Sequence, residues 1–342
     1  MGQTSREFSR AQPLLNLHLP AGGPLGCRLA AVMNLTPRPT VAIRLHRLPE
    51  LDLAGMVASG TVTPAAASML RAAVRAGLNM VVSGGPGAGK TTLVRVLAHE
   101  IAPAEHVVTV EEERELGLHL DQARHPLVTP FEAREANAEG AGEISLDDLL
   151  KQALRHSPSR VIVGEVRGGE VTAMLRALAN GATGGMCTLH ANSAGAVFDR
   201  IAALAQLAHP PLPIIAAYQW TATAINFIVH VERRDSIDSR GRRSRRRMVT
   251  EIIEVGPVGD SGRPDATVVF GPGPDGSTVP LLPPSPKLLA ELTRQGFDWQ
   301  AAQLPTGHPP TTRYTPGGYD TGPRRSSGAA GNGWAGNGRA ER

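Results

Sequence analysis

Residues 84–91, GGPGAGKT, have the composition of a loop that binds phosphate. The glycines leave backbone N–H groups free to point into one concave loop, where they can gather around an anion. The Lys90 ammonium can reach the β- and γ-phosphates of a nucleotide, and the Thr91 hydroxyl can ligate Mg²⁺. The residues predicted to hold the nucleotide are Gly84, Gly85, Pro86, Gly87, Ala88, Gly89, Lys90, Thr91 and Thr92.

The surroundings of this loop predict a strand before it and a helix after it. The apolar run 80–82 precedes the glycines, and the segment 93–97, LVRVL, follows Lys90 and the threonines. We therefore expect a strand over 78–83 and a helix over 90–101. An ordinary tight turn is the alternative, but the full motif in this context favours a nucleoside triphosphate site.

Glu165 is the first candidate for a carboxylate near the metal. It follows the short apolar segment 160–163, which is typical of a strand in a buried parallel sheet. Open α/β sheets bind ligands at the C-terminal ends of their strands. We therefore expect this strand to lie next to the strand of the glycine-rich loop, and Glu165 to hold Mg²⁺ together with Thr91. An ion pair with Arg167 or Arg160 is the alternative role.

Residues 111–115, EEERE, place a second group of acidic side chains directly after a predicted strand at 106–111. Four ionised carboxylates cannot share one dry site, because like charges raise one another's pKa. We therefore expect one or two to face the nucleotide and the others to face solvent. Alternation along an extended segment would place Glu111, Glu113 and Glu115 on one face, where one of them could reach an attacking water.

His190 lies in the segment 183–193, TGGMCTLHANS, after another predicted strand. A lone histidine is more often a packed core residue than a functional one. Small polar residues flank this one, which favours contact with a phosphate or with a neighbouring subunit.

The composition is typical of a chain of about two domains with an aliphatic core, since 41% of its 342 residues are hydrophobic and only 4% are aromatic. Cys27 and Cys187 lie far apart without a metal-ligand spacing, which indicates a reducing, cytoplasmic setting. No apolar run is long enough to span a bilayer, and the segment 13–20 is too short for a signal sequence. We therefore expect any membrane association to be peripheral.

Arginines crowd one short segment and contribute to the formal net charge of +4. Such a run could bind nucleic acid or anionic lipid. Strand-like segments flank it at 227–231 and 248–253, and no aromatic residue is interleaved to stack bases. We therefore favour a solvated hairpin tip and expect no direct contact with nucleic acid. The arginines are Arg233, Arg234, Arg240, Arg242, Arg243, Arg245, Arg246 and Arg247.

The chain divides into five predicted segments, and alternating strands and helices in the central one favour a three-layer α/β core with a mainly parallel sheet. They are residues 1–24, expected to be poorly ordered; 25–76, with two short strands and a helix; 77–255, the nucleotide domain with the arginine-rich hairpin; 256–302, a Pro/Gly-rich segment with one helix; and 303–342, expected to be a disordered tail.

Four strings closely resemble, in order, the motifs of the type II/type IV secretion ATPases, and within that family the tight-adherence pilus and conjugation branch. GGPGAGKTTL is similar to the Walker A box and VEEERELGL to the acidic box. RVIVGEVRGGEV is similar to the Walker B box and GGMCTLHANSA to the histidine box. The resemblance covers roughly residues 25–300, and four independent motifs make it specific.

The resemblance implies a RecA-like P-loop NTPase fold behind a short remnant of an α+β N-terminal domain. It implies a homohexameric ring that hydrolyses ATP with Mg²⁺ at the cytoplasmic face of the inner membrane. The implied partners are integral inner-membrane platform proteins, and the implied work is pilus assembly or protein secretion. The alternatives are an ATP-binding ring scaffold with little turnover and a conjugative nucleic-acid transfer ATPase.

The resemblance also assigns roles to individual side chains. They are Glu115, the general base; Glu165, the Walker B carboxylate; His190, the phosphate-sensing histidine; Arg124 and Arg134, which match arginines near the γ-phosphate; and Arg44 and Arg47, which fall where the N-terminal domain lends an arginine to the nucleotide.

Two features depart from the family pattern. Glu112 stands where the family usually has Asp, and its longer arm could shift the metal or the water. The N-terminal domain is short and retains only its last strands. We therefore expect the nucleotide chemistry of the family, whereas the sequence does not identify which membrane platform protein this short domain would contact.

Overall fold

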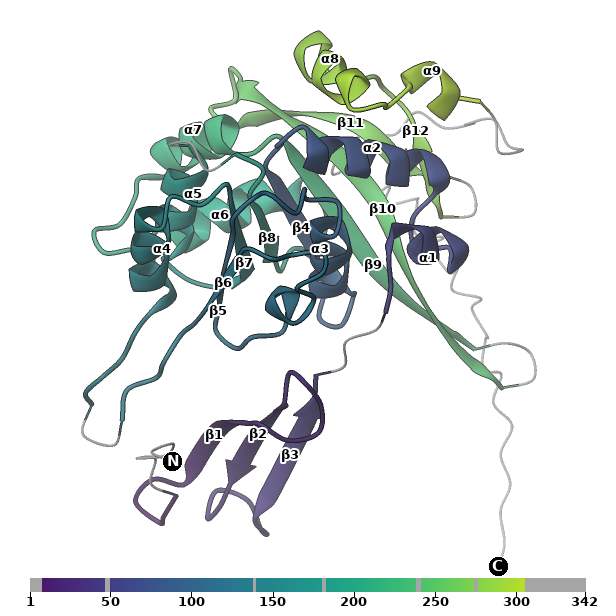
Figure 1. Cartoon of the computed structure of the whole chain (residues 1–342). Coiled ribbons are helices and arrows are strands. Elements are labelled where there is room, and N and C mark those ends of the chain that lie inside the picture. Colours follow the sequence, from purple (N-terminus) through teal and green to yellow (C-terminus); the bar gives the residue numbers. More distant parts are fainter. Residues whose placement is uncertain are drawn as a thin grey trace, which may run out of the picture.

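The computed structural model describes residues 8–46, 50–137, 140–179, 183–237, 241–273 and 276–304. These residues form a small three-stranded sheet at the N-terminus and a nine-stranded sheet with helices on its faces (Figure 1). The small sheet stands apart from the body of the molecule in Figure 1. Within the described ranges, no helix has both the length and the apolar character needed to cross a membrane.

The small sheet is antiparallel, and its first strand lies in a region that we expected to be poorly ordered. Leu14 pairs with Val32 and Leu19 pairs with Cys27. The prediction of disorder is therefore wrong for this part of residues 1–24. Leucines alternate with Asn16 and His18 here, a period-two pattern typical of a strand. The strands are β1 (Leu14–Leu19), β2 (Cys27–Val32) and β3 (Thr40–Leu45).

The large sheet has the strand order β12-β11-β10-β9-β4-β8-β7-β5-β6. The strands from β9 to β6 in this order pair in parallel, and those from β9 to β12 pair antiparallel. The predicted α/β class with a mainly parallel sheet is confirmed. The strands are β4 (Met80–Gly84), β5 (Val107–Glu111), β6 (Val128–Glu132), β7 (Arg160–Val166), β8 (Met186–Leu189), β9 (Phe227–Ile237), β10 (Arg243–Val258), β11 (Pro264–Pro272) and β12 (Thr278–Pro280).

Helices cover both faces of the large sheet and enclose two apolar clusters. One cluster includes side chains of α1, α2, α3 and α8, and the other includes side chains of α4, α5, α6 and α7. The helices are α1 (Leu53–Ala58), α2 (Pro64–Arg75), α3 (Lys90–Ala98), α4 (Leu146–Arg155), α5 (Val171–Ala179), α6 (Ala196–Ala205), α7 (Ile214–Ala224), α8 (Pro286–Arg294) and α9 (Trp299–Ala302), with a short 3₁₀ helix at Leu118–Leu120.

Local sequence explains where the helices begin. Thr63 caps α2 by accepting a hydrogen bond from the Ala66 N–H, and proline stands at the first helical position. Ser145 and Asp148 form a capping box at the start of α4, in which each side chain accepts from the other residue's backbone N–H.

The segment after residue 255 is part of the core. β11 and β12 extend the nine-stranded sheet. Leu288 and Leu292 of α8 are buried in the same apolar cluster as Met69 and Leu70 of α2. Residues 305–342, which make up most of the tail expected at 303–342, lie outside the described residues.

The arginine-rich segment forms a hairpin whose strands are longer than expected. β9 continues to Ile237 and β10 begins at Arg243, so most of these arginines lie on the strands themselves. Cross-strand pairs extend the ladder: Arg245 Nε donates to Asp235 at 2.9 Å, and the Ser236 and Ser244 hydroxyls are 2.7 Å apart. The expected solvated hairpin is therefore present, with its arginines on the exposed ends of the two strands, and Arg240 lies outside the described residues.

Candidate functional site

Four strands deliver the candidate residues to one edge of the large sheet. β4 leads into the glycine-rich loop, β8 into His190, β7 carries Glu165, and β5 leads into the acidic box. β8 lies between β4 and β7 and pairs in parallel with both. The expectation that the Glu165 strand lies next to β4 is therefore wrong. The short, buried segment of β8 fits between those two strands and places His190 between the loop and Glu165.

The glycine-rich loop has a backbone that other residues would adopt only with strain. Gly84, Gly87 and Gly89 have φ values of +152°, +67° and +101°. A Cβ on Gly84 would lie only 2.2 Å from the carbonyl oxygen of Val231. The loop then turns directly into α3, which begins at Lys90 and directs its N-terminal N–H groups toward the loop.

Lys90 bends back over the loop. Its Nζ donates to the carbonyl oxygens of Gly84 at 3.1 Å and Gly85 at 3.2 Å, and to His190 Nδ1 at 3.2 Å. Burial lowers the pKa of Lys90, while the nearby Glu165 carboxylate opposes that shift. The ammonium thus lies in the concave part of the loop, where a phosphate would bind.

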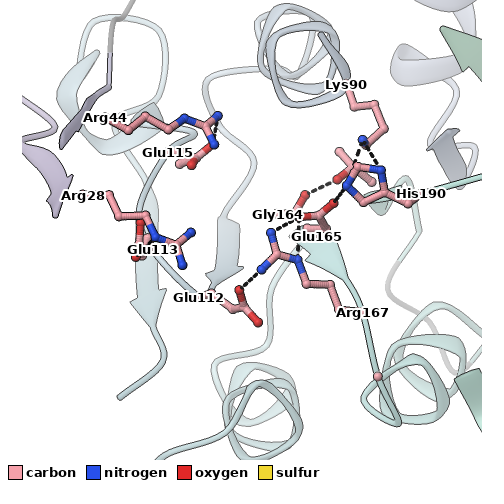
Figure 2. A network of polar contacts seen from close by, with 12 residues as sticks. Arg28, Arg44, Lys90, Glu112, Glu113, Glu115, Gly164, Glu165, Arg167 and His190 are labelled. Atoms are coloured by element: carbon pink, nitrogen blue, oxygen red, sulfur yellow. Dashed lines mark hydrogen bonds and ion pairs between the residues drawn. The ribbon is translucent and has the colours of Figure 1, made fainter. Parts of the chain in front are cut away.

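His190 connects Lys90 to Glu165 (Figure 2). An ammonium has only donors, so Nδ1 of His190 accepts from Lys90 and Nε2 carries the ring proton. Nε2 lies 2.6 Å from Glu165 Oε1. Burial, together with the Lys90 charge, lowers the pKa of His190, and Glu165 opposes the shift. The imidazole therefore lies between a cation and an anion and contacts both.

Arg167 joins Glu165 to the acidic box, as Figure 2 shows. Its Nε donates to Glu165 Oε2 at 2.7 Å, and its Nη1 donates to Glu112 Oε2 at 2.6 Å. The longer side chain of Glu112, which stands where the family usually has Asp, therefore forms an ion pair with Arg167. The ion pair that we weighed as an alternative for Glu165 is present together with the His190 contact, whereas Arg160 pairs with Glu105 instead.

Glu111 holds the acidic box in shape. It is the last residue of β5, is 2% exposed, and accepts the backbone N–H groups of Glu115 and Leu116, both at 2.9 Å. Burial raises its pKa to about 7, although these two donors oppose the shift. The chain bends around this carboxylate. The expectation that Glu111, Glu113 and Glu115 share one face of an extended segment is therefore wrong.

The remaining carboxylates of the box face the N-terminal sheet. Arg28 Nε lies 3.1 Å from Glu113, and Arg44 Nη2 lies 3.9 Å from Glu115 (Figure 2). His46 is buried between them, 3.7 Å from Glu113 and 3.6 Å from Glu115. Arg44 therefore contacts the candidate general base, and Arg47 lies outside the described residues.

Two predicted arginines contact other parts of the chain. Arg124 Nη1 lies 3.2 Å from His99 Nδ1 and 3.7 Å from Asp121. Arg134 Nε donates to the Gly142 carbonyl at 2.6 Å. Over the described ranges, neither arginine contacts the connected side chains of Lys90, His190 and Glu165. Thr91 and Thr92 lie in the first turn of α3, both partly exposed.

These features define an α/β protein of the P-loop NTPase type. The family model "Type II/IV secretion system protein" matches residues 11–250. A putative conjugal transfer protein of Mycobacterium tuberculosis is 40% identical over 242 residues, 70% of this chain and 66% of that protein. The type IV secretion system protein PtlH of Bordetella pertussis is 36% identical over 272 residues, 71% of this chain and 76% of that protein.

Among solved structures, the ATPase DotB of Legionella pneumophila has a similar fold. Its TM-score is 0.51 at 17% sequence identity, over 72% of this chain and 65% of that chain. The chain belongs to the type II/IV secretion system protein family. It spans 66% of the length of its mycobacterial relative.

Proposed function

We propose that this chain is an ATP-hydrolysing motor that powers pilus assembly or protein secretion. The observation that carries the proposal is the connected set of side chains at one sheet edge, from Lys90 through His190 to Glu165. These side chains join the phosphate-binding loop to the acidic group that an NTPase needs. The name of PtlH, which refers to type IV secretion, agrees with this function, whereas the name of the mycobacterial relative refers to conjugal transfer.

In this proposal the arriving phosphates replace the carbonyl partners of Lys90. Backbone N–H groups of the loop and the start of α3 bind the anion, and the Lys90 ammonium turns toward it. The position of the terminal phosphate then determines whether the contact between His190 and Lys90 is kept. Arg167 holds Glu165 in place, and Glu115 takes the proton of the attacking water.

The donor atoms near the loop fit a magnesium ion. Mg²⁺ prefers oxygen ligands, and the Thr91 hydroxyl and the Glu165 carboxylate supply two of them beside the phosphates. We propose these two residues as its protein ligands. When bound, the ion neutralises charge that develops on the phosphate oxygens.

The proposal also includes a homohexameric ring that works at the cytoplasmic face of the inner membrane, against integral-membrane platform proteins. A single P-loop domain leaves one side of its nucleotide open to water, and a cation from a neighbour or from the N-terminal sheet would complete the site. Arg44, beside Glu115, is the candidate in the N-terminal sheet. Arg124 and Arg134 are the candidates for a neighbouring subunit.

The test of hydrolysis is Glu165→Gln, which keeps size and removes charge. We expect the variant to bind ATP with wild-type affinity and to lose turnover, because the carboxylate acts on the metal and not on nucleotide affinity. Binding is measured by calorimetry with a slowly hydrolysed ATP analogue, and turnover by phosphate release. Turnover by the variant at the wild-type rate would contradict the assigned role of Glu165.

Two other functions give different results in the same preparation. A regulatory scaffold would bind ATP and show no turnover by the wild-type chain, with or without inner-membrane vesicles. A conjugative nucleic-acid ATPase would bind DNA, with an affinity that falls steeply as salt is raised. We expect turnover, and no DNA affinity of that kind.

A further inference from the structure

Two arginines from the arginine-rich strands contact the glycine-rich loop from outside. Arg233 of β9 and Arg247 of β10 are cross-strand partners, so their side chains project from the same face of the ladder. Arg247 Nε donates to the Gly87 carbonyl at 3.0 Å, and Arg233 Nη1 donates to the Pro86 carbonyl at 3.4 Å. Both partners are backbone oxygens of consecutive loop residues.

The planarity of the peptide bond gives these contacts a consequence for phosphate binding. The Pro86 carbonyl belongs to the same rigid unit as the Gly87 N–H, and the Gly87 carbonyl to the same unit as the Ala88 N–H. In a trans peptide the C=O and N–H point in opposite directions. Holding the two oxygens toward the arginines therefore turns the two N–H groups to the other side of the loop. The Ala88 N–H accordingly donates across the turn to the Gly85 carbonyl at 3.3 Å and closes the loop.

The shape of the loop agrees with this arrangement. A Cβ on Gly87 would lie 2.9 Å from Arg233 Nη1, and a Cβ on Gly89 would lie 3.1 Å from Arg247 Cδ. The glycines thus leave room for the arginine side chains as well as for a ligand. An ion pair within β9 also holds Arg233 in place, since its Nε lies 3.5 Å from Asp235.

We propose that Arg233 and Arg247 are positioning residues that hold the loop in its phosphate-binding form. Arg233 directs the Gly87 N–H toward the phosphates, and Arg247 holds the peptide unit whose Ala88 N–H closes the turn onto Gly85. The proposal rests on the proposed function, since it concerns the same nucleotide site. Each guanidinium polarises the peptide unit it contacts and makes its N–H a stronger donor. β9 and β10 are thereby connected to the nucleotide through the backbone of the loop.

The first test measures nucleotide affinity in Arg233→Ala, Arg247→Ala and the double variant. We expect each single change to weaken binding of a slowly hydrolysed ATP analogue about tenfold, the effect of losing one charge-assisted hydrogen bond. Arg247→Lys, which keeps a charged donor, should recover part of the loss. Arg246→Ala is the matched control. It removes the same charge from the neighbouring position, whose side chain projects from the opposite face of β10.

The second test needs no nucleotide. Amide hydrogen exchange in the free protein should be faster at Gly87 and Ala88 in the two arginine variants, and unchanged in Arg246→Ala and in the core strand β4. This readout separates a local effect on the loop from a general loss of stability, which would speed exchange in β4 as well.

The outcomes separate this proposal from the proposed function. If the wild-type chain binds no nucleotide, the proposed function fails, and the exchange experiment still decides the role of the arginines. Wild-type affinity in both arginine variants would overturn the positioning role alone. An equal loss in Arg246→Ala would also overturn it, because the effect would then be one of net charge.

Discussion

Glu111, Glu112, Glu113 and Glu115 are near neighbours in sequence but have different environments. Glu111 is buried against two backbone N–H groups, and Glu112 pairs with Arg167. Glu113 and Glu115 face the arginines of the N-terminal sheet. Because the chain bends after Glu111, the carboxylates of Glu111 and Glu112 lie away from the other two, whereas Glu113 and Glu115 share the contact with His46. Glu111 can therefore be tested separately from that pair.

Lys90→Ala should abolish ATP turnover and leave the fold intact. The change removes the ammonium that lies in the concave part of the loop, and with it the charge that stabilises the transferring phosphoryl group. Phosphate release measures the loss, and circular dichroism with thermal unfolding checks the fold. Turnover within about threefold of wild type, well under 1 kcal/mol in barrier, would exclude this site.

Glu111 should make the protein less stable as the pH rises. Its folded pKa of about 7 lies above the ordinary value of 4.5, so its contribution to stability is complete below about pH 4.5 and is lost as the pH rises through 7. A shift of this size corresponds to about 3 kcal/mol. Glu111→Gln accepts the same N–H bonds without titrating, and should remove this part of the pH dependence.

Urea unfolding of wild type and Glu111→Gln at about pH 5 and about pH 8 measures that difference. Other groups titrate equally in both proteins and cancel in the comparison. We expect the variant to gain stability relative to wild type at the higher pH. If the unfolding free energies of the two proteins differ by the same amount at both pH values, the result would contradict the raised pKa of Glu111.

At the scale of elements, the N-terminal sheet is joined to the core by ion pairs. Arg28 and Arg44 pair with the acidic box, and His18 lies 3.8 Å from Glu132 at the end of β6. Neither apolar cluster of the core includes a residue of β1, β2 or β3 among the described residues. Partly exposed ion pairs are weak individually and are screened by salt.

We therefore expect high salt to loosen the contact between the small sheet and the core. Spin labels at two exposed positions, Leu35 beyond β2 and Leu154 on α4, report their separation. Raising the ionic strength from about 0.05 M to about 0.5 M should broaden and lengthen the distance distribution. Labels at Leu154 and Leu207, both exposed on the part of the chain that carries the large sheet, are the control. An unchanged distribution for the first pair would show that other contacts hold the sheet.

Local signals in the sequence predicted the glycine-rich loop with the strand before it and the helix after it, whereas α6, α7, β6, β11 and β12 were not predicted. The position of β8 between β4 and β7 was not predicted, because strand order depends on pairings between distant segments. The contact of Arg233 with Pro86 joins residues 147 positions apart, and no local pattern indicates it. The bend after Glu111 was missed because a buried carboxylate and backbone donors overrode simple alternation.

At the scale of the whole molecule, Arg124 and Arg134 contact other parts of their own chain and not the connected Lys90 site. The Arg124 side chain is about half exposed. Such arginines are available to a second subunit, as the proposed ring requires. An arginine supplied by a neighbour makes hydrolysis depend on the geometry of the assembly.

We expect a hexamer that ATP stabilises and in which subunits depend on one another. Light scattering with and without a slowly hydrolysed ATP analogue gives the mass. Mixing inactive Lys90→Ala chains into wild-type rings should reduce turnover more steeply than in proportion to the wild-type fraction. A monomer at every concentration, or a strictly proportional loss of activity, would contradict the ring motor.

The packing of α2 against α8 has a consequence for how the chain is made. Met69 and Leu70 leave the ribosome early, but Leu292 and Phe297, in the same apolar cluster, are among the last described residues to be synthesised. At about 5–20 residues per second, roughly 10–50 s separate the two events. During that interval the nascent core exposes an apolar helix face, which makes this stretch of synthesis the period when a chaperone would be needed.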